Sequence, residues 1–224
     1  TSAEVSACVK ADGYGLGLVP VARTLSQAGC STFFVATALE GAELRSLLPK
    51  ATIYVLNGLY EGSERLFEAE DLRPCLSSLE EVRDWAAYCG QTGPLSAALH
   101  ADTGIRRLGV QFHDLGAVTD LAASFETDLV MSHLACADDA DHPLNEEQRG
   151  LFDQLRPRLP EAPASLANTA GILLGPQFHY DLVRPGIGLY GTSPFPNPGH
   201  PFHPVVTLTS SIMQVKSIEA GDQV

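Results

Sequence analysis

Short apolar runs alternate with longer amphipathic stretches along most of the chain. Most of the runs are apolar on both sides of the pleat, which is typical of parallel strands covered by helices on two faces. Eight runs have the length and composition of such strands: VSACVK (5–10), TFFVA (32–36), TIYVL (52–56), RPCLS (73–77), LSAAL (95–99), DLVMSHL (128–134), ASLAN (164–168) and DLVRPG (181–186).

The stretches between these runs have the signals of helices. Ser78 and Glu81 have the spacing of a capping box, and the fixed φ of Pro143 suits the first turn of a helix. The expected helices cover residues 19–29, 38–48, 62–70, 78–89 and 142–159.

The number of strand–helix units decides between two α/β architectures. Eight units of about 25 residues match a (β/α)8 TIM barrel, whose usual length is about 250 residues. An open doubly wound sheet is the alternative, but six strands suit it better than eight. We therefore predict a barrel.

The alternation ends near residue 191, which predicts three parts: a barrel over 1–191, a proline-rich linker over 192–204 and a new element over 205–224. The last part has period-two patterning, with Val206 and Leu208 on the same face. We expect it to be the first strand of a truncated C-terminal β-domain, because a strand without a partner is unstable alone.

Composition and charge exclude several classes of protein. Fourteen basic and 27 acidic side chains give a net charge of −13, which disfavours nucleic-acid and anionic membrane partners. The chain has no apolar stretch of membrane-spanning length and no signal-peptide pattern at its start, so we expect a soluble, cytoplasmic protein. Five scattered cysteines without a CxxC pair suit a reducing compartment and oppose structural zinc.

Lys10 ends the first predicted strand, in the stretch CVKADGYGLG (8–17). The carboxyl ends of barrel strands face the active site, and apolar surroundings there lower the pKa of an amine. A neutral lysine is a nucleophile suited to Schiff-base chemistry with a carbonyl. The glycine-rich turn that follows lets backbone amides approach an anion. A solvated lysine at a strand end is the alternative.

Two later motifs are suited to phosphate binding. RPGIGLYG (184–191) places Arg184 and the amides of Gly186 and Ile187 after the eighth strand, and barrels often bind phosphate on the last two loops. LANTAG places Asn168 and Thr169 at a strand–helix junction. A surface arginine is the alternative for the first motif. An ordinary helix N-cap is the alternative for the second, and there both roles can hold together.

These motifs together resemble those of the alanine racemase family of pyridoxal-phosphate enzymes. VKADGYGLG resembles the family's lysine motif; HADTGIRRLGV (100–110), SHLACAD (132–138), LANTAG and RPGIGLYG follow in the family's order and at similar spacings. The resemblance implies that pyridoxal 5'-phosphate is the cofactor and Lys10 the Schiff-base lysine. It also implies that Tyr14 binds the phosphate and that Arg184 faces the pyridine nitrogen.

The resemblance assigns two further residues. It places Arg107 beside the cofactor phenolate and the substrate carboxylate, and His133 against the cofactor ring. His100 stands where many members have a carbamylated lysine paired with the arginine, and histidine cannot form a carbamate. Three possibilities are left open: Arg107 is positioned by Asp102, it is positioned by a bound chloride, or its orientation is looser than in those members.

The implied activity is the interconversion of L- and D-alanine for cell-wall synthesis by a homodimer. Racemisation needs acid/base groups on two faces of the α-carbon. Lys10 is one; the family's other base is a tyrosine of a C-terminal domain, supplied by the partner subunit, and we expect it to lie outside these 224 residues.

Three alternatives remain at this stage. One is a barrel that binds pyridoxal phosphate without racemase activity, and another is a related racemase or decarboxylase acting on a different amino acid. The third is a metal site of His100, Asp102 and His133, which leaves Lys10 and the arginines unexplained. We therefore predict no metal.

Overall fold

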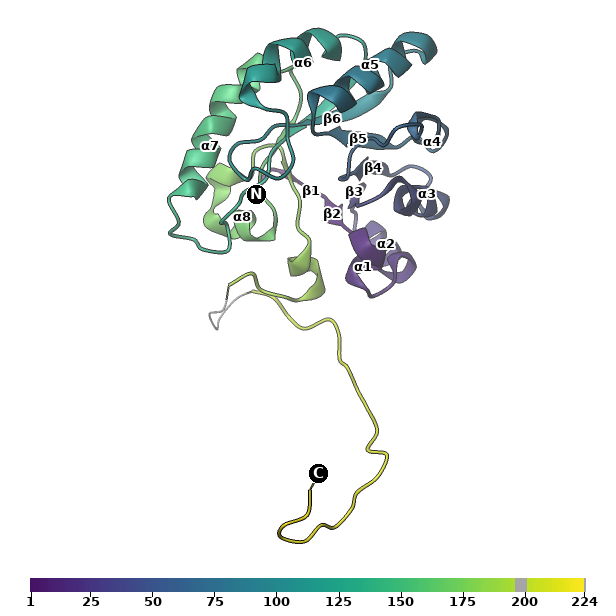
Figure 1. Ribbon diagram of the computed structural model, residues 1–224, viewed down its shortest axis with the longest axis vertical. Coiled ribbons are helices and arrows are strands. Elements are labelled where there is room, and N and C mark those ends of the chain that lie inside the picture. Colours follow the sequence, from purple (N-terminus) through teal and green to yellow (C-terminus); the bar gives the residue numbers. More distant parts are fainter. Residues whose placement is uncertain (196–200, 224) are drawn as a thin grey trace.

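The computed structural model describes residues 1–195 and 201–223, and it forms a parallel barrel surrounded by helices (Figure 1). All eight predicted strand runs form strands, and the first is split in two at Ser6. The strands are β1 (Glu4–Val5), β2 (Ala7–Cys8), β3 (Thr32–Val35), β4 (Thr52–Val55), β5 (Arg73–Leu76), β6 (Ser96–His100), β7 (Glu126–Met131), β8 (Ala164–Ser165) and β9 (Leu182–Val183).

The strands close into a ring in chain order, which confirms the barrel. Strands β2 to β8 form one parallel sheet, and β1 pairs in parallel with β9. Between β8 and β9, the Asp181 amide donates to the Ala164 carbonyl at 3.0 Å and the Arg184 amide to the Ala167 carbonyl at 2.9 Å. The first predicted strand, split into β1 and β2, therefore joins the two ends of the sheet: β2 pairs with β3, and β1 pairs with β9.

The helices follow the predicted pattern. The Ser78 hydroxyl caps its helix by accepting the Glu81 amide at 3.1 Å, and Pro143 immediately precedes another helix. None of the helices within 1–195 and 201–223 has the length and apolarity needed to cross a bilayer. The helices are α1 (Lys10–Tyr14), α2 (Leu18–Gln27), α3 (Ala38–Leu47), α4 (Glu64–Ala69), α5 (Leu79–Thr92), α6 (Leu115–Ala122), α7 (Leu144–Leu155) and α8 (Thr169–Leu174).

The strands are apolar on both faces because each face packs into its own apolar layer, one inside the barrel and one between the strands and the helices. Phe33 on β3 packs into the layer between strands and helices, whereas its neighbour Phe34 faces the barrel interior. Both are fully buried. Successive strand residues point to opposite sides, so a strand that contributes to both layers has no polar face.

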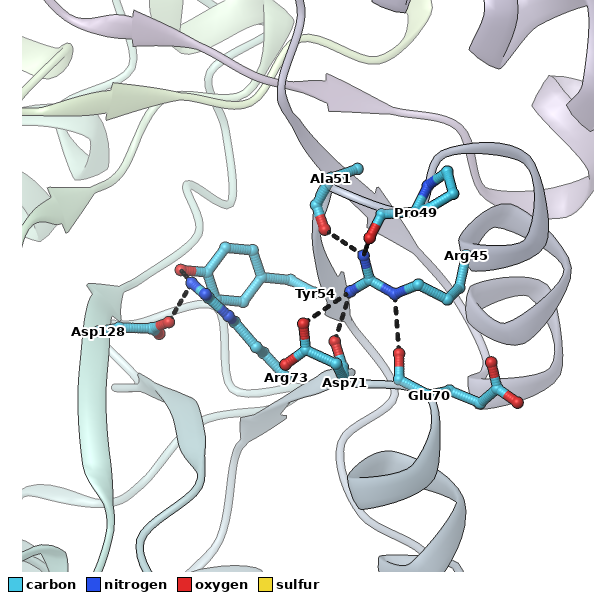
Figure 2. Close-up of polar contacts among 8 residues, drawn as sticks. All are labelled: Arg45, Pro49, Ala51, Tyr54, Glu70, Asp71, Arg73 and Asp128. Atoms are coloured by element: carbon cyan, nitrogen blue, oxygen red, sulfur yellow. Dashed lines mark hydrogen bonds and ion pairs between the residues drawn. The ribbon is translucent and has the colours of Figure 1, made fainter.

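A charged pair lies inside the barrel, near the amino ends of the strands. The guanidinium of Arg73 on β5 pairs with the Asp128 carboxylate on β7 and donates to the Tyr54 hydroxyl at 3.4 Å. Figure 2 shows the Arg73 side chain between these two groups. Burial raises the pKa of Asp128 to about 6, although the cation of Arg73 opposes this shift. The Arg73–Asp128 pair joins two strands that are not neighbours.

Arg45 of α3 ties the loops outside this end of the barrel together. Its guanidinium donates to the carbonyls of Ala51 at 2.7 Å, Glu70 at 2.9 Å and Asp71 at 2.6 Å (Figure 2). These carbonyls come from the segments that lead into β4 and β5. One side chain therefore satisfies acceptors of two successive loops.

The strand predicted over 205–224 is not formed. Residues 205–218 contain no strand, and Figure 1 shows the end of the chain away from the barrel. Leu208 and Met213 are almost fully exposed. The physical reason is that no strand of the described residues lies alongside to accept the backbone hydrogen bonds. Part of the predicted linker, residues 196–200, and Val224 lie outside the described residues.

Candidate active site

A cavity of about 340 Å³ lies at the carboxyl ends of the strands. Lys10 lines the cavity just after the end of β2, and His133 and Arg184 line it just after the ends of β7 and β9. Every residue predicted for the site lines this cavity: Lys10, Tyr14, Arg107, His133, Asn168, Thr169, Arg184, Gly186 and Ile187. The fold thus brings together residues from five separate motifs.

A left-handed turn follows Lys10. Ala11, Asp12, Gly13 and Tyr14 have φ values of 55°, 53°, 61° and 56°, so three residues with a Cβ occupy a region that favours glycine. The Asp12 carboxylate accepts the Leu18 amide at 2.6 Å and holds the far end of the turn. Lys10 is half-buried, and its side-chain amine has no hydrogen bond or ion pair with any described residue.

Arg184 is fully buried beneath the cavity. Its guanidinium donates to the Ser165 hydroxyl at 2.5 Å and to the Ser132 carbonyl at 2.6 Å. Burial lowers the pKa of Arg184 to about 10, which leaves the side chain charged at neutral pH. The cation is therefore fixed by strands β7 and β8 rather than by a carboxylate.

His133 lies next to this cation. Its Nδ1 is 3.5 Å from Nη2 of Arg184, and because arginine only donates, Nδ1 must be the acceptor. Burial and the Arg184 charge lower the pKa of His133 to about 3, so the ring is neutral. Its proton is then on Nε2.

His100 is also buried and neutral, with its pKa lowered to about 4 by burial and by Arg184. The Ser77 hydroxyl donates to the Cys75 carbonyl at 3.1 Å and lies 3.2 Å from His100 Nδ1. Nδ1 therefore carries the proton. The lone pair of Nε2 is buried and has no partner among the described residues.

The lowered pKa of these buried histidines predicts how the free energy of unfolding changes as the pH falls. A histidine whose folded pKa is lowered contributes stability that is complete above the unfolded pKa of about 6.5 and is lost as pH falls towards the folded value. Replacing His100 by glutamine should make the loss of unfolding free energy between pH 7 and pH 5 smaller by about 2 kcal/mol. Urea unfolding at the two pH values measures this difference.

His113, which is exposed, provides the control. His113→Gln removes an exposed ring that lies 3.6 Å from the Asp114 carboxylate, so it should change this loss far less than His100→Gln does. An equal loss in wild type and His100→Gln would show that His100 is not a buried neutral histidine.

Arg107 is exposed and lines the cavity from the β6–α6 loop. Asp102 does not pair with it: the Asp102 carboxylate accepts the amides of Gly104 at 2.8 Å and Arg106 at 3.1 Å instead. The described residues also contain no group of three or more His, Cys, Asp or Glu side chains placed to hold a metal. His100, Asp102 and His133 therefore do not form the alternative ligand set.

Thr169 organises the side of the cavity that the sequence predicts to bind phosphate. Its buried hydroxyl accepts the amides of Gly186 at 2.9 Å and Gly188 at 3.2 Å, so its own hydrogen remains available to donate. The Gly186 amide, predicted to face phosphate, is thus engaged by Thr169. Asn168 caps α8 through the Gly171 amide at 2.9 Å, which confirms the N-cap reading.

Gly186 leaves no room for a side chain. A Cβ there would collide with the hydroxyl oxygen of Tyr14. Gly186→Ala should therefore cost about 1–3 kcal/mol of unfolding free energy through overpacking. Urea unfolding should show that Tyr14→Phe in the same chain restores most of this loss, because it removes the colliding oxygen. A double variant no more stable than Gly186→Ala would contradict the close contact.

Cys8 and Phe34 also line the cavity, and the sequence analysis did not select them. Cys8 lies two residues before Lys10, so the period of a strand puts both on the barrel's inner side. That spacing was the available signal. The Tyr14 hydroxyl lies 3.8 Å from the Cys8 sulfur, and the Tyr14 ring stacks on Tyr190 at 4.6 Å.

Residues 1–194 match the family described as alanine racemase, N-terminal domain. The chain belongs to the alanine racemase family. It is 47% identical to the alanine racemase of Rhodospirillum rubrum over 224 residues, which cover 97% of this chain and 59% of that protein. It is 45% identical to the catabolic alanine racemase of Mesorhizobium japonicum, covering 95% and 57%. The chain thus spans somewhat more than half the length of these relatives.

Solved alanine racemases have the same barrel. The crystal structure of alanine racemase from Bartonella henselae with covalently bound pyridoxal phosphate superposes with a TM-score of 0.87 at 37% identity, covering 90% of this chain and 60% of that one. The biosynthetic alanine racemase from Pseudomonas aeruginosa gives a TM-score of 0.78 at 34% identity, covering 87% and 55%. The barrel fold predicted from the sequence is therefore that of the family.

Proposed function

We propose that this chain is the pyridoxal-phosphate-binding barrel of an alanine racemase. The observation that best supports this proposal is that Lys10, Thr169 and Arg184 all line one cavity. An amine without a partner suits an aldehyde, and a hydroxyl with a free hydrogen beside a glycine-lined loop suits a phosphate. The cofactor's covalent attachment in the Bartonella henselae relative supports the same reading.

The residues of the cavity are suited to hold this cofactor in distinct ways. Lys10 would form the covalent link, and Tyr14, Asn168, Thr169 and Ile187 would hold the phosphate end. Gly186 would act there through Thr169, whose hydroxyl accepts the Gly186 amide. When bound, pyridoxal phosphate supplies a conjugated ring that accepts the electrons left as a proton leaves the α-carbon.

Arg184 and His133 would set the electronic character of the site. Arginine keeps its proton in proteins, so Arg184 facing the pyridine nitrogen would donate to it and leave it unprotonated. The neutral His133 accepts from Arg184 and adds no second positive charge. Such a site limits the lifetime of a carbanion, which suits racemisation and opposes side reactions such as transamination.

Proton transfer is divided between two faces of the substrate. Nζ of Lys10 would remove or return the proton on one face. Arg107 would hold the substrate carboxylate, for which a bidentate guanidinium is suited. The base for the other face is proposed to be a tyrosine of a C-terminal domain, contributed by the second subunit of a homodimer.

The proposed biological setting follows from the same assignment. The active protein is a cytoplasmic homodimer that supplies D-alanine for cell-wall synthesis, and residues 1–191, 192–204 and 205–224 are its barrel, its linker and the start of its β-domain. The exposed apolar side chains of the last segment, such as Leu208 and Ile212, support a segment that packs against that domain.

A chimera tests the proposed activity. Residues 1–224 are joined to the C-terminal part of the Rhodospirillum rubrum relative, and conversion of L-alanine to D-alanine is measured with pyridoxal phosphate present and with serine as a control substrate. The chimera should racemise alanine, and the 224-residue chain should bind the cofactor but turn over poorly. Equal turnover by both would refute the two-base assignment, and a chimera that binds the cofactor without racemising would favour a binding module.

A further inference from the structure

Glu40 holds the start of α3 through an ordinary capping box. Its Oε2 accepts the amides of Ala36 at 2.7 Å and Thr37 at 3.4 Å, and the Thr37 hydroxyl accepts the Glu40 amide at 3.3 Å. These contacts satisfy amides that a helix N-terminus leaves without partners. They use only one of the two carboxylate oxygens.

The other oxygen makes a contact that helix capping does not need. Oε1 of Glu40 accepts the amide of Ala11 at 2.8 Å, across 29 residues of sequence. Ala11 directly follows Lys10 and is the first residue of the left-handed turn, with φ of 55°. Because alanine disfavours this conformation, a contact from outside the turn is needed to stabilise it.

The Ala11 amide bears directly on the direction of Lys10. The peptide group between the two residues is planar, so the direction of the Ala11 N–H sets ψ of Lys10. On the other side, the Val9 amide donates to the Phe34 carbonyl at 2.9 Å and fixes the approach of the strand. Glu40 thus completes the backbone restraint around the lysine.

We propose that Glu40 is a positioning residue for Lys10, acting through the Ala11 amide to aim the ε-amine into the cavity. This inference rests on the proposed function, in which Lys10 links to the cofactor aldehyde. A carboxylate suits the task because each of its two oxygens accepts hydrogen bonds. Glutamine offers one acceptor oxygen and an NH₂ group, so it cannot satisfy both Ala11 and Ala36.

Three single variants separate positioning from helix capping. Glu40→Gln removes one of the two acceptors. Thr37→Ala removes the other half of the capping box but keeps the Glu40 carboxylate, and Glu43→Gln changes an exposed glutamate of the same helix. A double variant, Ala11→Gly with Glu40→Gln, relieves the turn, because glycine adopts positive φ without steric cost.

The first readout needs no cofactor. Hydrogen exchange of the Ala11 amide, followed by NMR, should be about tenfold faster in Glu40→Gln than in wild type, since a hydrogen bond to a carboxylate is lost. Thr37→Ala and Glu43→Gln should leave it near the wild-type rate. An unprotected Ala11 amide in the wild-type protein would overturn the inference even if Glu40→Gln failed to fold.

The second readout is the rate at which pyridoxal phosphate links to Lys10. The amine condenses with the aldehyde and releases water, borohydride delivers hydride to the carbon–nitrogen double bond, and mass spectrometry quantifies the labelled peptide. Glu40→Gln should be labelled about tenfold more slowly, and the double variant should recover part of the rate.

The outcomes keep the two proposals apart. A wild-type protein without label on Lys10 overturns the proposed function. Label on wild-type Lys10 with an equal rate in Glu40→Gln overturns the role of Glu40 and leaves the proposed function standing. A loss in Thr37→Ala as large as that in Glu40→Gln also overturns it, because the effect would then come from the start of α3.

Discussion

Replacing Lys10 by methionine is expected to abolish both the visible absorbance that pyridoxal phosphate gives with the protein and its sensitivity to borohydride. Only an amine condenses with the aldehyde, and methionine is an unbranched apolar side chain that fits the half-buried position. Some cofactor should still bind to Lys10→Met through its phosphate contacts alone, and dialysis should remove it. Absorbance spectra before and after reduction measure the change.

The chain offers a matched control for this substitution. Lys50 is exposed and does not line the cavity, so Lys50→Met should retain full absorbance and full reducibility. A wild-type spectrum in Lys10→Met would contradict the assignment of Lys10 as the lysine that links to the cofactor. It is equally contradicted if Lys50→Met loses the spectrum while remaining folded.

Removing the Asp128 carboxylate is expected to cost about 3 kcal/mol of unfolding free energy, the largest loss among the stability variants considered. The side chains of Arg73 and Asp128 are 26% and 15% exposed. Asp128→Ala leaves the Arg73 cation inside the barrel without its counter-ion, and that desolvated charge is the source of the cost. Urea unfolding at pH 7 measures the loss.

Two comparisons show whether the cost comes from the unpaired charge. Glu146→Gln breaks an exposed pair with Arg149, in which Glu146 is 58% exposed, and should cost less than about 0.5 kcal/mol. The apolar double variant Arg73→Met with Asp128→Leu should be more stable than Asp128→Ala, because it leaves no buried charge. A double variant less stable than Asp128→Ala would contradict this explanation.

The strand order and the positions of Lys10 and Arg184 were predictable from local pattern, whereas Tyr14, Arg107 and His133 were assigned through the resemblance to the family. Runs such as TFFVA and TIYVL are apolar on both faces because Phe33 and Phe34 enter different layers, and such runs alternating with helices indicate a parallel barrel. Lys10 and Arg184 were predictable because each ends a strand, and barrel strands end at one rim. Sequence order alone therefore placed them on the same side of the molecule.

The partners of these residues were not predictable, since they depend on which strands become neighbours. Ser165, which binds Arg184, and Ser77, which binds His100, have no local signal that distinguishes them from other small polar residues. The left-handed turn at Ala11 was also missed, because the Glu40 carboxylate that accepts the Ala11 amide lies 29 residues away in the sequence. Tertiary contacts override local preference in each case.

The strand predicted over 205–224 failed for a related reason. Alternation at Val206 and Leu208 indicates a side-chain pattern, whereas a strand also needs a neighbouring backbone. No described strand lies beside this segment. Period-two patterning predicts which residues share a face and does not by itself form a sheet.

The most direct test of the account maps where the cofactor attaches. The wild-type protein is incubated with pyridoxal phosphate, reduced with borohydride, digested and analysed by mass spectrometry. We predict one phosphopyridoxyl group, on Lys10, formed in preference to labelling of the other two lysines, Lys50 and Lys216. Label spread evenly over the three, or absent from Lys10, would contradict it.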